Sequence, residues 1–155
     1  MTVEFNDFSD EEKSLPTILI AEDNIQTRDL LKKFFSKAND RKDLKCEIVE
    51  ANDGEEAIEM LDTIYPHLIL CDIGMPKKDG FEVLEHFNTV SKKTNPFCFF
   101  SFLSAAPEEK IKAFNEGAMG FLSKKEINYF MIVLQIKAWL RLSRLERYYK
   151  SIRQK

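Results

Sequence analysis

Strand-like runs rich in β-branched or aromatic residues alternate with amphipathic segments along almost the whole of this chain. The predicted strands lie near residues 17–22, 45–50, 67–72, 97–104 and 119–123. The predicted helices lie near residues 25–38, 54–64, 79–91 and 107–116, and a long one begins near residue 126. Such alternation is typical of a parallel sheet with helices packed on both faces. The sequence therefore predicts an α/β fold with five strands and five helices.

Length and composition indicate one domain with a charged segment at each end. A chain of 155 residues with 44% hydrophobic residues has the length of one ordinary domain and can bury a single core. We expect residues 1–15, which carry five acids and one lysine, to form a flexible acidic tail. Residues 16–140 form the predicted domain, and residues 141–155 continue its last helix as a basic extension.

Charge, cysteines and hydropathy exclude several classes of protein. The formal net charge of -3 argues against a domain that coats nucleic acid. Cys46, Cys71 and Cys98 each lie in an apolar run without metal-ligand spacing, which favours small core residues in a reduced setting. No apolar stretch approaches the ~18 residues that a membrane-spanning helix needs, and the N-terminus is acidic where a signal peptide would be basic. We therefore expect a soluble, cytoplasmic protein.

Carboxylates follow two of the predicted strands at the point where each strand ends. Asp72 closes the apolar run 67–71, and Glu22 and Asp23 follow the run 17–21. The carboxyl ends of parallel strands meet at one edge of the sheet, where ligands bind in open α/β folds. The sequence thus predicts that three acids converge on one site.

Four segments identify a family that this chain resembles. They are residues 18–24 (ILIAEDN), 68–80 (LILCDIGMPKKDG), 102–106 (FLSAA) and 117–124 (GAMGFLSK). In this order they resemble the receiver domain of bacterial two-component response regulators, over roughly residues 16–140. The resemblance implies a flavodoxin-like, doubly wound sheet with strand order 2-1-3-4-5. It also implies that Asp72 accepts a phosphoryl group from the phosphohistidine of a histidine kinase or a histidine phosphotransfer protein.

The same resemblance implies a magnesium site among the acids. Asp23 matches the metal-binding acid of the family, Asp72 shares the ion, and Gly74 offers its backbone carbonyl. Glu22 would bind the ion directly or through water. Mg²⁺ prefers such oxygen ligands and keeps several waters, which phosphoryl oxygens can replace.

Three further residues match the positions that sense the phosphoryl group. Lys124 would act as a point charge on the phosphoryl oxygens, and Ser104 would donate its hydroxyl to them. Phe121 stands at the aromatic switch position, where the common residue is Tyr, so its ring can turn inward but has no hydroxyl.

Phe121 is thus one departure from the family pattern, Lys125 is a second, and Gly74 also bears on the phosphoryl group. Lys125 follows Lys124 where the family has Pro after a cis bond, which leaves open whether this peptide bond is cis or trans. Gly74 leaves the attacking water unshielded by a side chain, and we hypothesise that this affects the phosphoryl lifetime.

The last helix carries an apolar stripe past the end of the predicted domain. Leu142, Leu145, Tyr149 and Ile152 recur at intervals of three, four and three residues. Two alternatives are open for this segment. It packs on its own domain with a basic outer face, or it forms a short parallel coiled coil that makes a homodimer or transmits the switch.

These observations predict a phosphorylation-controlled switch in a two-component or phosphorelay pathway and not an enzyme. One alternative is a pseudo-receiver that binds partners without being phosphorylated, which Phe121 and Lys125 keep open. Another is an aspartyl-phosphate phosphatase, but the haloacid dehalogenase pattern needs an acid where Gly74 stands. A nucleic-acid binder is disfavoured because the basic helix has no base-reading motif.

Overall fold

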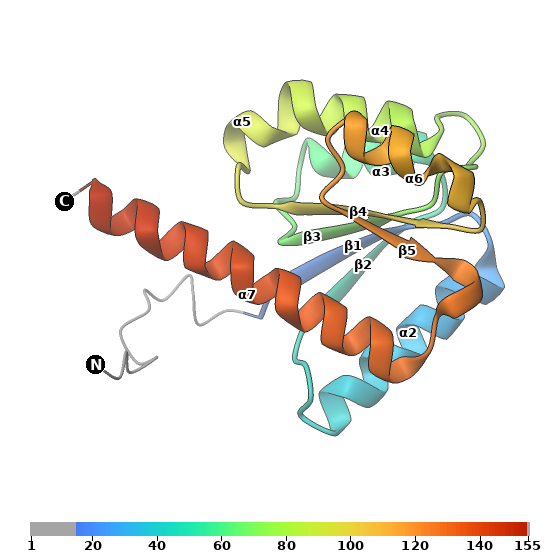
Figure 1. Cartoon of the computed structure of the whole chain (residues 1–155), viewed down its shortest axis with the longest axis horizontal. Coiled ribbons are helices and arrows are strands. Elements are labelled where there is room, and N and C mark those ends of the chain that lie inside the picture. Colours follow the sequence, from blue (N-terminus) through green and yellow to red (C-terminus); the bar gives the residue numbers. More distant parts are fainter. Residues whose placement is uncertain (1–14, 155) are drawn as a thin grey trace.

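The computed structural model describes residues 15–154, so residues 1–14 of the predicted acidic tail and Lys155 lie outside the described residues. Five parallel strands form one sheet in the order β2-β1-β3-β4-β5, as expected from the sequence. The strands are β1 (Thr17–Ala21), β2 (Glu47–Ala51), β3 (Leu68–Cys71), β4 (Phe99–Ser104) and β5 (Gly120–Ser123). The predicted flavodoxin-like fold with an extended C-terminal helix is confirmed (Figure 1).

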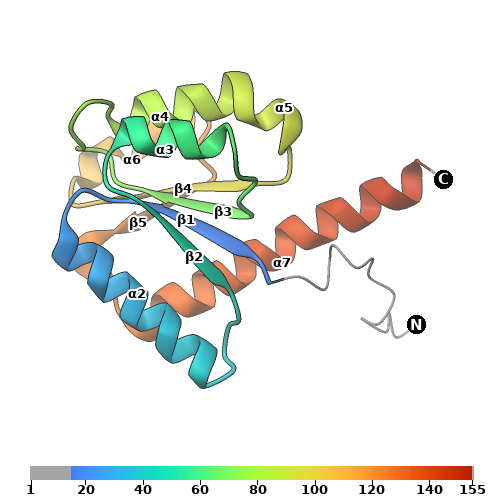
Figure 2. The same ribbon diagram turned by 180° about the vertical axis from the view of Figure 1, so that it is seen from behind.

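Helices cover both faces of the sheet. They are α2 (Ile25–Asp40), α3 (Gly54–Leu61), α4 (Gly80–His86), α5 (Lys92–Thr94), α6 (Lys110–Asn115) and α7 (Tyr129–Arg153). Short 3-10 turns at Pro107–Glu109 and Lys124–Glu126 precede α6 and α7. Helices α2 and α7 lie on one face, and α3, α4 and α6 lie on the other (Figures 1 and 2).

The sheet divides the core into two layers, as strand β1 illustrates. Ile18 and Ile20 pack with residues of α2 and α7, whereas Leu19 and Ala21 pack with residues of α3, α4 and α6. Successive side chains of a strand point to opposite faces, so a strand that is buried on both faces is apolar throughout. This is why the first predicted strand is a continuous apolar run.

The segment after α4 differs from the sequence expectation. The predicted helix 79–91 and the predicted strand 97–104 leave residues 92–96 as a connection, but the helix continues through a π-helical stretch, Phe87–Ser91, into α5. It stops where Asn95 donates a side-chain hydrogen bond to the Pro66 carbonyl. Polar surface residues thus extend the helix as far as the residue before proline permits.

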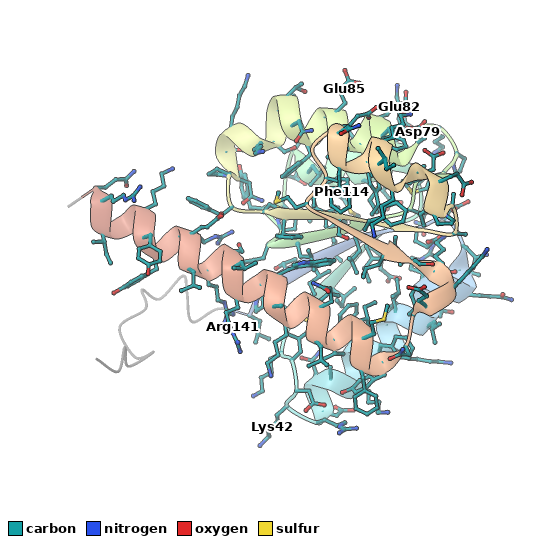
Figure 3. The ribbon with its side chains drawn as sticks, viewed as in Figure 1. Lys42, Asp79, Glu82, Glu85, Phe114 and Arg141 are labelled. Atoms are coloured by element: carbon teal, nitrogen blue, oxygen red, sulfur yellow. The ribbon has the colours of Figure 1, made fainter. Side chains whose placement is uncertain are left out.

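The loops at the carboxyl edge of the sheet lead into capped helices. Asn24, Asp53 and Asp79 each accept a hydrogen bond from a backbone N–H in the first turn of α2, α3 and α4. At α4 the Glu82 side chain also accepts from the Asp79 N–H, which completes a capping box (both labelled in Figure 3). These caps fix the loops in which the predicted site residues lie.

Two further expectations concern the cysteines and the membrane. All three cysteines are free and buried, as predicted. Among residues 15–154, no helix combines the length and the apolar character needed to cross a bilayer.

Candidate functional site

The three acids predicted to converge do lie together at the carboxyl edge of the sheet. Glu22 and Asp23 follow β1, and Asp72 follows the neighbouring strand β3. A carboxylate oxygen from each lies within 4.8 Å of the others. Glu22 and Asp72 are buried, whereas Asp23 is exposed, so the cluster opens to solvent on the Asp23 side.

Lys124 brings a positive charge to this cluster from across the sheet. Its Nζ lies 2.7 Å from Glu22 Oε2 and 3.2 Å from Asp72 Oδ2. The residue directly follows β5, an edge strand, and β4 lies between β5 and β3. The contact between Lys124 and the acids therefore spans several strands, and only the folded sheet can make it.

Burial and charge shift the pKa values of these groups away from their ordinary ranges. Burial raises the pKa of Glu22 from 4.5 to about 7, although the hydrogen bond from Lys124 opposes this. Burial also raises the pKa of Asp72, against the opposing charge of Lys124. Burial lowers the pKa of Lys124, but its ion pairs with Glu22 and Asp72 outweigh this and raise it above its ordinary value. One lysine near three acids leaves excess negative charge that favours a further cation.

The Asp72 carboxylate is held by both of its oxygens. Oδ1 accepts a 2.8 Å hydrogen bond from the Ile73 N–H, and Oδ2 contacts Lys124. The Asp72 N–H donates to the Ala21 carbonyl, which continues the pairing of β3 with β1. A Cβ placed on Gly74 would meet nothing within 4 Å, so the space beside Gly74 is open. The carboxylate is thus fixed in place with open space nearby.

Ser104 ends β4 next to this cluster but bonds within its own loop. Its side chain is buried, and its Oγ accepts a 3.0 Å hydrogen bond from the Ala106 N–H. In the part of the chain that the structure describes, no hydrogen bond joins this hydroxyl to Asp72. The hydroxyl must turn from Ala106 before it can donate to a group on Asp72.

A family model supports the assignment that the site geometry suggests. The model described as "Response regulator receiver domain" matches residues 18–132. This chain belongs to that family. The match includes every site residue predicted above and stops four residues into α7.

Curated relatives of this receiver domain are longer proteins. A protein-glutamate methylesterase/protein-glutamine glutaminase of Pseudoalteromonas atlantica is 32% identical over 110 residues, which are 70% of this chain and 27% of the relative. The nitrate/nitrite response regulator protein NarL of Escherichia coli is 32% identical over 108 residues, 70% of this chain and 47% of the relative. The receiver domain thus spans less than half the length of either relative.

Solved structures show the same fold at lower identity. A CheY-like receiver domain protein from Methanospirillum hungatei has a TM-score of 0.72 and 24% identity, covering 86% of this chain and 99% of that one. The response regulator TrrA from Thermotoga maritima, solved in complex with Mg²⁺ and BeF, has a TM-score of 0.67 and 23% identity over 81% of this chain and 99% of its own.

The two departures from the family pattern have defined structures in this receiver domain. Phe121 pairs with Phe102 across β5 and β4, and its ring is partly buried against the layer beneath α3, α4 and α6. The Lys124–Lys125 peptide bond is trans, which answers the question that the sequence left open. Ser123 Oγ accepts a hydrogen bond from the Lys125 N–H at the start of the turn into α7.

Sequence reasoning did not assign a role to Gly80, which begins α4. A Cβ at this position would lie 2.3 Å from the Asp72 carbonyl oxygen and 2.8 Å from Ile73 Cα. The Gly80 N–H also donates a 2.7 Å hydrogen bond to the Ile73 carbonyl. Helix α4 therefore starts directly against the backbone of Asp72. The Asp79-Gly80 pair signals a turn, but the sequence does not show what the turn packs against.

Arg28 is a second residue whose role sequence reasoning missed. Its Nη1 donates a 2.7 Å hydrogen bond to the Glu22 carbonyl, and its Nε lies 3.2 Å from Glu50 Oε1. Arg28 thereby ties α2 to β2 and to the loop that carries the acids. Its position within a predicted amphipathic helix gave no sign of this contact.

Proposed function

We propose that Asp72 of this receiver domain accepts a phosphoryl group from a phosphohistidine on a histidine kinase or a phosphotransfer protein. The observation that carries the proposal is the Asp72 carboxylate, oriented by the Ile73 N–H and contacted by Lys124 beside two further acids. Membership of the receiver family supports the same reaction.

In this reaction a carboxylate oxygen of Asp72 bonds to phosphorus as the nitrogen–phosphorus bond of the phosphohistidine breaks. The electron pair of that bond leaves with the imidazole, and Asp72 becomes an aspartyl phosphate. Both reactants are anionic, so their approach requires positive charge in the site. Lys124 supplies fixed charge, and its Nζ exchanges contact with the carboxylates for contact with the phosphoryl oxygens.

The donor set fits Mg²⁺, because carboxylate oxygens of three acids lie within 4.8 Å of one another and hard oxygen ligands are those that this ion prefers. Asp23, Asp72 and the Gly74 carbonyl would hold the ion, with Glu22 binding directly or through water. When bound, the ion supplies charge that offsets the negative phosphoryl oxygens.

The outcome of the reaction is a changed conformation that a partner or an output domain detects. Ser104 releases the Ala106 N–H and donates its hydroxyl to the phosphoryl group. The partly buried Phe121 ring turns into the space that Ser104 leaves. We assign this switch to residues 16–140 and treat residues 141–155 as an extension with a separate role.

Acetyl phosphate and Mg²⁺ provide a test that needs no cognate kinase. We expect the intact mass of the wild-type chain to increase by one phosphoryl group, and Asp72→Asn to abolish the increase. Asp29→Asn is the matched control, because Asp29 is an exposed acid on α2 outside the cluster. Beryllofluoride should change the spectroscopic signal of the wild type and Asp29→Asn but not that of Asp72→Asn.

Two other functions would give different results. A pseudo-receiver would show no Asp72-dependent response to either reagent. An aspartyl-phosphate phosphatase would turn over added phosphomonoesters, but Gly74 provides no acid two residues after Asp72.

We also propose that the protein works in the cytoplasm. Its three cysteines are free and buried, and burial raises the pKa of Cys46 to about 11. Such thiols act as small apolar core groups, which suits a reducing compartment.

A further inference from the structure

The long helix α7 carries apolar side chains on two different faces. Its inner face packs on the sheet and on α2, and Trp139 stacks on Phe99 with ring centroids 4.8 Å apart. The buried residues of this face are Tyr129, Ile132, Val133, Ile136, Trp139, Leu140 and Ser143. They recur at helical spacing, so they occupy one side of α7 and leave the other side free.

The inner face keeps contact with the domain beyond its last core residue. The buried Ser143 hydroxyl donates a hydrogen bond to the Phe97 carbonyl, just before β4. Two turns further on, Lys150 Nζ lies 5.1 Å from the centroid of the Phe97 ring. The C-terminal turns of α7 project past the edge of the sheet in both views (Figures 1 and 2), and these two contacts join them to the segment before β4.

The outer face carries the apolar stripe that the sequence predicted. Leu142, Leu145, Tyr149 and Ile152 are 53%, 42%, 61% and 49% exposed. The helix therefore packs on its own domain through its opposite side, and the stripe itself takes no part in that contact. Large apolar side chains exposed in a continuous row mark an interaction surface.

The spacing along this stripe is that of a coiled-coil seam. The exposed Ala138 precedes Leu142 by four residues, so five positions follow one another at intervals of four, three, four and three. This places Leu142 and Tyr149 at a positions and Ala138, Leu145 and Ile152 at d positions of a heptad.

The charges beside the seam match a parallel pairing with an identical helix. Arg141 falls at a g position and Glu146 at the following e position, and these positions face each other across a parallel coiled coil. Within the described part of the chain neither side chain has an ion-pair partner. Figure 3 shows Arg141 projecting outward from α7 rather than toward the sheet. Two copies would therefore form this ion pair twice.

We propose that this receiver forms a parallel homodimer through residues Ala138, Leu142, Leu145, Tyr149 and Ile152 of α7, with Arg141 of each copy paired to Glu146 of the other. The second copy approaches from the side opposite the sheet, so the two domains do not compete for the same space. The dimer forms without phosphorylation, because the seam is exposed in this conformation.

A lipid surface is the competing occupant, since a basic amphipathic helix can also lie on a membrane. The placement of two of the basic residues and of one acid argues against it. Arg147 is half-buried and Lys150 lies over the Phe97 ring, so both serve the inner face and do not flank the outer stripe. Glu146, beside the seam, would repel an anionic lipid surface.

Sedimentation equilibrium of the full chain over about a hundredfold range of concentration tests the proposal, because the dimer fraction follows mass action. We expect the mass to rise from that of the monomer to twice that value, and Leu145→Glu to hold it at the monomer value. Gln154→Glu adds the same charge to an exposed position off the seam and should leave the dimer unchanged. Circular dichroism verifies that each variant is folded.

Exchanging the charges of Arg141 and Glu146 tests whether the two helices of the dimer are parallel. Arg141→Glu should weaken the dimer by placing like charges across the seam, and Arg141→Glu combined with Glu146→Arg should restore it. In an antiparallel pair these two positions do not face each other, so a double variant that stays as weak as the single variant overturns the parallel arrangement.

A wild type that remains monomeric throughout, or that binds anionic phosphatidylserine vesicles through Leu145, overturns the dimer. Asp72→Asn should dimerise like the wild type, which separates this result from that of the phosphorylation test.

Discussion

Lys124 lies closer to Glu22 than to Asp72, with its Nζ 2.7 Å from the first carboxylate and 3.2 Å from the second. Glu22 is almost fully buried, and the burial that raises its pKa makes Lys124 its main source of compensation. The lysine therefore has two functions in the site. It stabilises a buried acid in the resting state and is the fixed cation nearest to the proposed phosphoryl acceptor.

Replacing Lys124 and, separately, its neighbour Lys125 shows whether the phosphorylation rate depends on the Lys124 ammonium or on the turn that carries it. Lys124→Met should slow phosphorylation by acetyl phosphate about 100-fold or more, because a preorganised positive group is lost where negative charge develops. Lys125→Met removes the neighbouring exposed lysine and should react like the wild type. The rate of mass increase under saturating Mg²⁺ measures both. Equal rates for the two variants would contradict the assignment of Lys124.

The raised pKa of Glu22 predicts how stability depends on pH when Mg²⁺ is absent. Its carboxyl binds a proton more tightly in the folded chain, where the pKa is about 7, than in the unfolded chain, where it is 4.5. The free energy of unfolding should therefore fall as the pH rises from about 4.5 to about 7, by roughly 3 kcal/mol at most. Urea unfolding with a chelator present measures this fall.

Glu22→Gln is the variant that identifies the source of that dependence. Its amide does not titrate, so the decrease in stability between these pH values should become smaller. Some decrease should remain, because burial also raises the pKa of Asp72. An identical slope in the variant and the wild type would show that Glu22 does not titrate in this range.

The close approach of α4 to the Asp72 backbone predicts that a single methyl group added at Gly80 lowers the free energy of unfolding. Gly80→Ala forces the Asp72 and Ile73 backbone to shift, since the two nearest contacts of the new Cβ are to backbone atoms and the Phe102 ring is the third. We expect a loss of about 1–3 kcal/mol in the free energy of unfolding. Gly74→Ala introduces the same methyl group into open space and should change stability little. Urea denaturation of both variants provides the comparison.

Open space beside Gly74 also permits a test of the phosphoryl lifetime. Gly74→Asn places a polar side chain near Asp72, where it can obstruct the water that attacks the aspartyl phosphate. The half-life of the phosphorylated protein should increase, and Gly74→Ala should have a smaller effect. Loss of the phosphoryl mass with time gives the half-lives. If the wild type and Gly74→Asn decay at the same rate, the hypothesis is wrong.

The sequence predicts the sheet and the position of the acids well, because both depend on local pattern. A buried parallel strand is a continuous apolar run. The residue that follows it lies at the carboxyl edge of the sheet, however the helices pack against that sheet. For this reason Asp72, Glu22 and Asp23 could be brought together before any coordinates were known. The placement of Lys124 came from the resemblance to the receiver family, since its contact with them spans the sheet.

The parts that could not be predicted depend on packing between distant segments. Nothing near Gly80 in the sequence shows that α4 begins against the Asp72 backbone, and nothing near Arg28 shows its bond to the Glu22 carbonyl. The partner of the Ser104 hydroxyl follows from the path of its loop. The periodicity of α7 located its apolar stripe but could not show which side faces the sheet.

The position of Lys124 at the end of an edge strand has a mechanical consequence. Only the turn Lys124–Glu126 and the cap at Asn128 separate it from the first residue of α7, Tyr129. With Asp72 phosphorylated as we propose, movement of the ammonium toward the phosphoryl group would pull on this turn, and α7, a helix of 25 residues, follows the turn directly. Lys124 and Tyr129 are only five positions apart in the chain, so a short stretch of backbone would connect the chemical event at Asp72 to this helix.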